Sequence, residues 1–167
     1  MRRMTALLSA AAFVLATTSA FAQKTSFAGT WVREAPAGGA AAGGGGGGGG
    51  RGGGGGGWGN EATITQDATT LTVKWMAGRE GTTPNERVYK LDGTESKNMV
   101  ARGGGEPMAI VSKATWDGPK LVIKTTTQAG EQTQVVSIEG GKLTIATTNP
   151  GREGGAPTTA TITYAKK

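Results

Sequence analysis

Apolar and polar side chains alternate along most of this chain from residue 60 onward. In one stretch Leu71, Val73 and Trp75 alternate with Thr72 and Lys74. A period of two places the apolar residues on one face of a β-strand, whereas no apolar stretch keeps a helical period for three turns. One apolar face and one face of Thr and Lys indicate antiparallel sheets with one buried side. The predicted strands are 27–33, 61–66, 70–76, 85–91, 94–102, 109–116, 120–127, 131–139, 142–148 and 158–165.

Short turns join most of these strands, so the simplest topology is an up-and-down meander. Gly140-Gly141 predicts a two-residue hairpin loop that places Ile138 opposite Leu143. A meander leaves two exposed edges, and pairing the first strand, 27–33, with the last, 158–165, would remove them. We therefore expect an all-β fold, an up-and-down antiparallel barrel of about ten strands.

A second turn predicts the register of another pair of strands. Asp117-Gly118 favours a hairpin in which Ala114 lies opposite Leu121, with Trp116 on the same side. Pro119 follows this turn and cannot donate a hydrogen bond within a ladder. The two strands are therefore expected to share one apolar face.

Residues 1–22 have the three parts of a secretory signal peptide. Two arginines begin the segment, an apolar run follows, and Ala20-Phe21-Ala22 matches a small-x-small cleavage site. The apolar run is short for a helix that spans a bilayer. We expect cleavage after Ala22, a single barrel domain over 23–167, and a periplasmic or extracellular protein without a membrane anchor. An uncleaved anchor is the alternative.

Glycine dominates residues 38–59, which divide the first predicted strand from the rest. Few side chains there could offset the entropy cost of ordering, so this segment is expected to be a disordered, flexible loop. Such a loop still allows the strands on either side to be neighbours. Arg51-Gly52-Gly53 and Trp58 resemble the Arg-Gly-Gly tracts that bind single-stranded nucleic acid. Those tracts usually repeat the arginine, so no nucleic-acid partner is expected.

The chain has no Cys and no His, and its formal net charge is +6. These absences exclude disulfides, thiol nucleophiles, Cys/His metal sites and every catalytic scheme that uses His. Asp67, Asp92 and Asp117 fall in predicted turns, where Asp is favoured for backbone reasons. No spacing pairs two carboxylates at one place. We expect no catalytic residues, no metal, no cofactor and no enzyme activity.

The segment Phe27-Ala28-Gly29-Thr30-Trp31 resembles the Gly-x-Trp opening of lipocalin and calycin barrels. Further likeness lies in Tyr89–Gly93, Ala114–Gly118 and Gly140–Thr144. Together these segments look like small secreted bacterial lipocalin-like proteins of undetermined function. The resemblance implies that Gly29 and Trp31 close the base of the barrel. Many lipocalins cover this Trp with an Arg near the C-terminus, where the chain has lysines instead.

Several large side chains share the inward parity of their predicted strands, and a wide barrel can hold a small apolar ligand among such residues. The candidate ligand-binding residues are Trp75, Tyr89, Trp116 and Leu121. Arg87 has the same parity as Tyr89 and could hold a ligand carboxylate. The alternative is that the aromatic residues only fill the core, and that Arg87 bends outward to water.

Three functions follow from these patterns. The first is an exported, non-enzymatic barrel that binds a small hydrophobic or amphipathic molecule. The second is a structural or interaction protein of the cell envelope or matrix, with a filled barrel and the glycine-rich segment as a spacer. The third is a hydrolase or isomerase that uses buried carboxylates. It requires two acidic side chains to converge inside the barrel.

Overall fold

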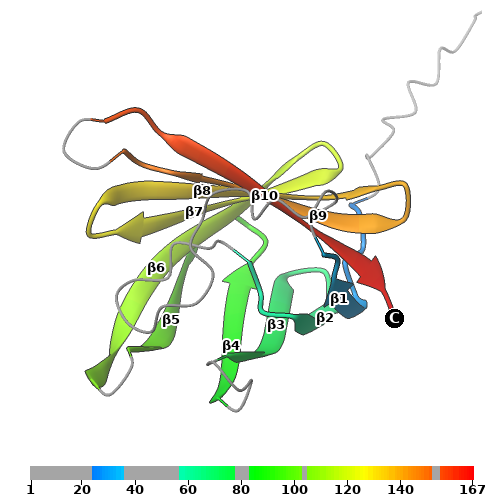
Figure 1. The fold of residues 1–167 in the computed structure, drawn as a ribbon, viewed down its shortest axis with the longest axis horizontal. Coiled ribbons are helices and arrows are strands. Elements are labelled where there is room, and N and C mark those ends of the chain that lie inside the picture. The colour runs from blue at the N-terminus through cyan, green and yellow to red at the C-terminus, as the bar shows by residue number, and fades with distance from the viewer. Residues whose placement is uncertain (1–23, 36–56, 78–82, 103–104, 152–154) are drawn as a thin grey trace, which may run out of the picture.

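The computed structural model describes residues 24–35, 57–77, 83–102, 105–151 and 155–167, and within these ranges it is an all-β barrel without helices (Figure 1). No helix in this part of the chain is long and apolar enough to cross a membrane. The strands are β1 (Gly29–Arg33), β2 (Glu61–Gln66), β3 (Thr70–Ala77), β4 (Thr83–Lys90), β5 (Glu95–Arg102), β6 (Gly105–Asp117), β7 (Lys120–Thr127), β8 (Gly130–Glu139), β9 (Lys142–Asn149) and β10 (Thr158–Lys166).

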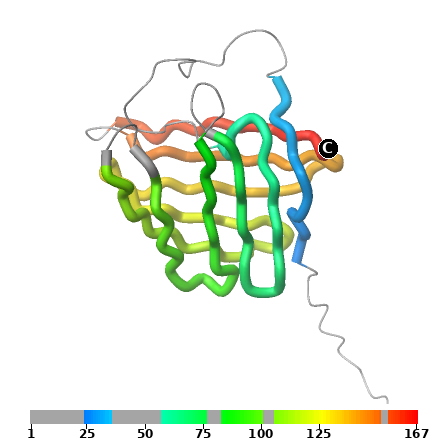
Figure 2. The backbone as a smooth tube through the Cα atoms, turned by 90° about the horizontal axis from the view of Figure 1, so that it is seen from below, coloured from blue at the N-terminus to red at the C-terminus, as the bar shows by residue number. Residues whose placement is uncertain are grey.

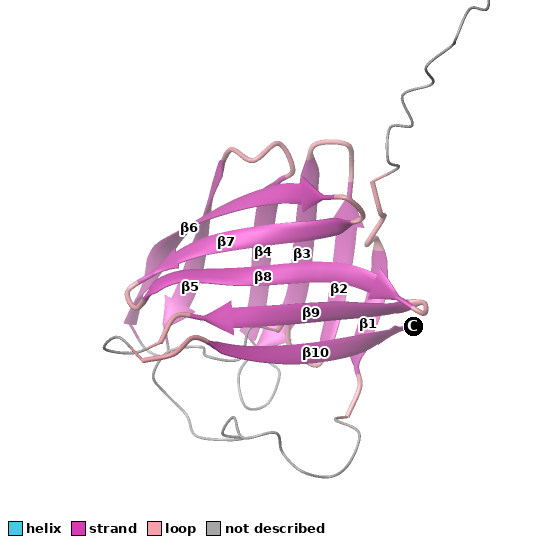
Figure 3. Cartoon of the chain, turned by 90° about the horizontal axis from the view of Figure 1, so that it is seen from above, coloured by secondary structure: helices cyan, strands magenta, loops and turns pink. Residues whose placement is uncertain are grey.

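The ten strands form one antiparallel sheet in the order β4-β3-β2-β1-β10-β9-β8-β7-β6-β5. The first and last strands pair, with Trp31 opposite Lys166 and Val32 opposite Ala165. This pairing confirms the predicted contact between the first and last strands. The strands β1–β4 run across the direction of β6–β10, so the sheet wraps around an enclosed core (Figures 2 and 3).

The ladder is interrupted at one place that the sequence did not predict. β4 and β5 follow each other in the chain, yet they are the two ends of the sheet order. We call this interruption the β4–β5 seam. Pairing β1 with β10 therefore does not remove both edges but moves them to the seam. Side chains of Ser96 and Asn98 on β5 bond the backbone of β4 there, in place of a strand-to-strand ladder.

Two predicted hairpins differ in outcome. Ile138 lies opposite Leu143, which confirms the Gly140-Gly141 register. Leu121, in contrast, lies opposite Trp116 and not opposite Ala114. The prediction was wrong by two residues because Gly118 and Pro119 form the turn, so the proline is not needed as a donor in the ladder.

The predicted leader, residues 1–22, and most of the glycine-rich segment lie outside the described residues. The end of that segment is described, and there Trp58 is fully buried. The backbone N–H of Trp58 donates a hydrogen bond of 2.8 Å to the Tyr164 hydroxyl. Gly59 follows with a φ of +68°, and a Cβ at this position would lie 2.8 Å from Cδ1 of Trp75. Trp58 and Gly59 are therefore built into the barrel.

Candidate ligand-binding site

One circumferential row of inward-facing side chains is entirely apolar. Successive register partners from β6 to β10 are Trp116, Leu121, Val136, Ile145 and Ile162. We call them the apolar row. Leu121, Val136 and Ile145 have no exposed surface at all. A side chain that lined an open, water-sized cavity would keep some exposed surface, so these residues fill the space between them.

A second inward-facing row is entirely polar, and the sequence analysis missed it. Ser96, Ser112, Thr125 and Gln132 are successive register partners from β5 to β8, and Asn149 and Thr158 are partners on β9 and β10. A side-chain bond from Gln132 to Asn149 joins the two groups. We call them the polar row. On β7 it lies four residues from the apolar row, which corresponds to about 13 Å along a strand. The interior therefore changes from apolar to polar along the strands.

Hydrogen bonds connect neighbours within the polar row. The hydroxyls of Ser112 and Thr125 lie 2.8 Å apart. The Gln132 amide donates to Oδ1 of Asn149 over 2.6 Å. Ser112 and Thr125 are buried, Gln132 and Asn149 are half-buried, and Thr158 is exposed. The row thus runs from the interior to solvent, and we call this end of the barrel the mouth.

The opposite end carries an aromatic cluster. Phe27 and Trp116 stack with ring centroids 5.8 Å apart, and Trp31 Nε1 donates to the Phe27 carbonyl over 2.8 Å. We call Phe27, Trp31 and Trp116 the aromatic end. Lys166 Nζ lies 5.7 Å from the centroid of the Trp31 ring, a cation–π contact at the position where the resemblance implied an Arg. Gly29 packs beside the same lysine, because a Cβ there would lie 3.0 Å from Lys166 Cε.

Trp75 and Arg87 come together on β3 and β4. The Arg87 guanidinium carbon lies 5.4 Å from the centroid of the Trp75 ring, and both side chains are half-buried. Arg87 faces the interior because it is the register partner of Val73, which is fully buried. The guanidinium is therefore held against an aromatic face while part of it stays accessible.

Three buried donors inside the barrel have no hydrogen-bond partner among the described residues. They are the Tyr89 hydroxyl and the indole N–H groups of Trp58 and Trp116. An unpaired buried polar group costs about 1–3 kcal/mol. The hydroxyl of Tyr164, in contrast, accepts from Trp58 and donates to the Gly59 carbonyl. Burial raises the pKa of this hydroxyl above its usual value near 10.

The predicted ligand-binding residues lie on four strands, β3, β4, β6 and β7. Trp75 and Arg87 contact each other, and Trp116 and Leu121 are register partners in the apolar row. Tyr89 lies opposite Leu71 and is fully buried. The polar row had one signal in the sequence: Ser112 has the parity of Ala114 and Trp116. Had Ser112 been assigned by its position in the alternation and not by its polarity, it would have been predicted to face the interior.

Acidic side chains lie outside the barrel. Every Asp and Glu in the described part of the chain is exposed or half-exposed. Several bond lysines across the outer face, as in Lys124–Glu131 at 2.9 Å and Lys142–Glu34 at 2.8 Å. No cluster of three or more potential acidic metal ligands occurs in these ranges. The described interior thus brings together no pair of carboxylates of the kind that the hydrolase alternative requires.

Comparison with known proteins supports the fold. No protein-family model matches the sequence, and no curated protein matches it. The fluorescent protein UnaG is 25% identical with a TM-score of 0.50, over 64% of this chain and 72% of that chain. A zebrafish ileal bile acid-binding protein, solved in complex with cholic acid, is 18% identical with a TM-score of 0.54, over 84% of this chain and 98% of that chain. These likenesses show an all-β, calycin-like barrel of ten antiparallel strands that is nearly closed.

Proposed function

We propose that this chain is an exported, non-enzymatic barrel that binds a small amphipathic molecule in its mouth. The observation that carries the proposal is the interior gradient from the apolar row to the polar row. A ligand with an apolar body and a polar head would match this gradient, because each part would meet side chains of its own kind. The zebrafish neighbour, a barrel of the same fold, was solved in complex with cholic acid.

Burial favours the mouth over the centre as the binding position. Leu121, Val136 and Ile145, at the centre of the apolar row, have no exposed surface. Trp75 and Arg87 on the β3–β4 hairpin are only half-buried, as is Asn149 in the polar row. A ligand would therefore rest above the filled apolar row, with the Trp75 ring beside its apolar part.

Arg87 would anchor an acidic head group. A guanidinium binds a carboxylate or sulfonate through two parallel hydrogen bonds, and it can do so while stacked on an aromatic ring. Arg87 adjoins Val88, whose backbone is bonded by the Asn98 side chain, two residues along β5 from Ser96. This position places the cation next to one end of the polar row.

Export is the second part of the proposal. It rests on the leader pattern of residues 1–22 and on the cleavage site at Ala22. The barrel makes contacts almost immediately after that site. Lys24 Nζ lies 5.8 Å from the Trp116 ring centroid, and the Thr25 carbonyl accepts a hydrogen bond from Gln66. Cleavage after Ala22 would leave all of these contacts in place. Detection of the intact leader on protein purified from cell extracts, with none outside the cytoplasm, would contradict this part.

The binding test uses the fluorescent anion 1-anilinonaphthalene-8-sulfonate (ANS) and sodium dodecanoate. We expect saturable ANS fluorescence, competition by dodecanoate and a raised Tm. Arg87→Gln should weaken binding by roughly tenfold or more, the usual cost of losing a charge-assisted hydrogen bond. Lys74→Gln is the matched control because it removes one positive charge from the outer face of the same hairpin, where Lys74 bonds Glu86. Absence of saturable binding of either compound would contradict the proposal.

A filled barrel that acts as a structural or interaction protein is the second candidate. The complete burial of Leu121, Val136 and Ile145 favours it. It predicts no response to ANS or dodecanoate, together with binding to cell-surface material that is lost when residues 38–56 are deleted, a deletion that keeps the buried Trp58. Unchanged surface binding after that deletion would remove the role of the glycine-rich segment.

A further inference from the structure

Side chains hold the β4–β5 seam together. The backbone N–H of Val88 donates to Oδ1 of Asn98 over 2.8 Å, and Asn98 Nδ2 donates back to the Val88 carbonyl over 3.0 Å. The backbone N–H of Lys90 donates to the Ser96 hydroxyl over 2.8 Å. Asn98 therefore makes the pair of bonds that a residue of a neighbouring strand would make.

The seam is weaker than the ladders around it. Between β3 and β4, eight pairs of residues are in register. Across the seam, the hydrogen bonds of the described residues depend on the side chains of Ser96 and Asn98, each of which can leave the backbone by a change of rotamer. Rotamer changes are local, whereas opening a ladder requires several backbone bonds to break together. The seam is thus the part of the described wall that can open at the smallest cost.

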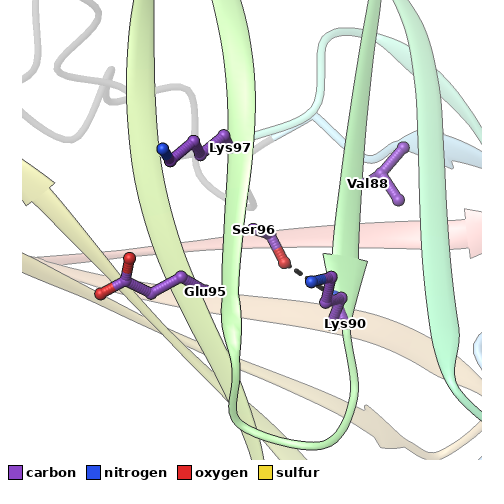
Figure 4. Close-up of a pocket in the computed structure, with 5 residues that line it drawn as sticks. All are labelled: Val88, Lys90, Glu95, Ser96 and Lys97. Atoms are coloured by element: carbon purple, nitrogen blue, oxygen red, sulfur yellow. Dashed lines mark hydrogen bonds between the residues drawn. The ribbon is translucent and has the colours of Figure 1, made fainter.

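A pocket of about 360 Å³ lies at the seam, lined by Val88, Lys90, Glu95, Ser96 and Lys97 (Figure 4). Four of these residues have the outward parity of their strands. Ser96 has the inward parity and belongs to the polar row, because it is the register partner of Ser112. The pocket therefore reaches from the outer surface to a member of the polar row.

The pocket carries excess positive charge. Glu95 lies 3.5 Å from Lys113 on the neighbouring strand, so its charge is partly compensated there. Lys90 and Lys97 form none of the salt bridges among the described residues. Two exposed ammonium groups beside an opening attract an anion. The pocket therefore favours an anion, the same class of ligand that Arg87 would bind inside the barrel.

We propose that the β4–β5 seam is a side entrance through which an amphipathic anion reaches the polar row, with Asn98 and Ser96 as its latch. This inference rests on the proposed binding function. It adds the route: the anion is collected at Lys90 and Lys97 and enters when the two latch side chains release the β4 backbone.

The first test closes the entrance reversibly. The chain has no cysteine, so the double variant Val88→Cys/Lys97→Cys introduces a unique thiol pair across the pocket. A short bis-methanethiosulfonate cross-links the pair, and a reductant releases it. We expect stopped-flow association and dissociation rates of ANS both to fall at least tenfold on cross-linking, with Kd unchanged within twofold, and to recover on reduction. The control pair is Lys113→Cys/Lys124→Cys, which lies across the intact β6–β7 ladder.

Unchanged rates in the cross-linked seam variant, with ANS still bound, would overturn the side entrance and leave the binding function standing. Absence of ANS binding in the unmodified protein would overturn both.

The second test opens the latch. Ser96→Ala and Ser137→Ala are matched because each removes a serine hydroxyl from a buried position with 5% exposure. Ser96 bonds the β4 backbone across the seam, whereas Ser137 lies outside the polar row and bonds Glu139 on its own strand. We expect Ser96→Ala to raise both ANS rates several-fold, and Ser137→Ala to leave them unchanged. In the unmodified protein, Val88 and Lys90 amides should exchange hydrogen at least 100-fold faster than those of Leu121 and Val136. Equal exchange, or equal rates in the two variants, would contradict the latch.

Discussion

The two ends of this barrel differ in the burial and polarity of their side chains. At the aromatic end, Trp31 is buried, its indole N–H is satisfied, and Lys166 covers its ring. On the β3–β4 hairpin, Trp75 is half-buried beside Arg87. At the mouth, Gln132 and Asn149 bond each other and are half-buried. Phe27 and Trp31 are thus packed more completely than the half-buried side chains of the hairpin and the mouth. The proposed function assigns stability to the aromatic end and recognition to the half-buried side chains.

The largest expected effect tests this division directly. Trp31→Ala should cost about 3–5 kcal/mol of unfolding free energy, because it empties a buried aromatic site. Trp75→Ala removes the same side chain from a half-buried position and should cost about 1–2 kcal/mol. Urea unfolding followed by circular dichroism measures both. Equal losses would show that the two ends are not different in packing.

A pair of substitutions on β7 tests the polarity gradient. Ile123→Thr puts a hydroxyl in a fully buried position and should cost about 2–3 kcal/mol. Thr125→Val, two residues nearer the mouth, keeps the shape but removes the bond to Ser112 and should cost about 1 kcal/mol. Thermal unfolding in calorimetry compares them. The gradient is contradicted if Thr125→Val is the more destabilising change.

Tyr164→Phe tests the bond that ties Trp58 into the barrel. The substitution leaves the backbone N–H of Trp58 without its acceptor and should lower the free energy of unfolding by about 1–2 kcal/mol at neutral pH.

The same variant gives a pH dependence. The pKa of the Tyr164 hydroxyl is raised in the folded state, so the unfolded state loses its proton first as the pH rises. The contribution of Tyr164 is therefore complete below pH 10 and declines above it. Urea midpoints from pH 8 to 11 should fall more steeply in the unmodified protein than in Tyr164→Phe. Parallel slopes would be inconsistent with a shifted hydroxyl.

The smallest expected effect concerns the exposed turns. Hydrogen bonds from Thr69 lower the pKa of Asp67, and hydrogen bonds from Thr94 lower that of Asp92. A lowered folded pKa means stability that is present above the usual value of 3.8 and is lost as the pH falls below it. Asp67→Asn and Asp92→Asn should each flatten the loss of stability between pH 4 and 2. Unchanged acid unfolding curves would remove this role of the turns.

The sequence predicted which face of a strand each side chain occupies. It predicted only some of the residue pairs that lie opposite each other on neighbouring strands. The pairing of β1 with β10 and the Gly140-Gly141 register were confirmed. The Leu121 register was wrong by two residues, and an error of two leaves every side chain on its predicted face. Hydrophobic alternation therefore could not detect it.

The seam and the polar row were not predicted from the sequence, for a related reason. Asn98 and Ser96 have inward parity, but alternation does not say whether an inward polar side chain bonds a neighbour, a ligand or the backbone. Only the arrangement of β4 against β5 shows that Asn98 replaces a ladder bond. The sequence placed the candidate residues Trp116 and Leu121 on the correct face of their strands. It did not predict the stacking of Phe27 on Trp116, because the two residues are far apart in the chain and meet only in the folded barrel.

The most direct measurement of the central claim is a titration of the ¹⁵N-labelled protein with ANS, followed by two-dimensional NMR. The proposed binding mode predicts chemical-shift changes for Trp75 and Arg87 and for the polar row from Thr125 to Asn149. The amides of Leu121, Val136 and Ile145 should stay in place. Shifts confined to those three residues, with Arg87 and Trp75 unmoved, would contradict the division between a filled apolar row and a binding mouth.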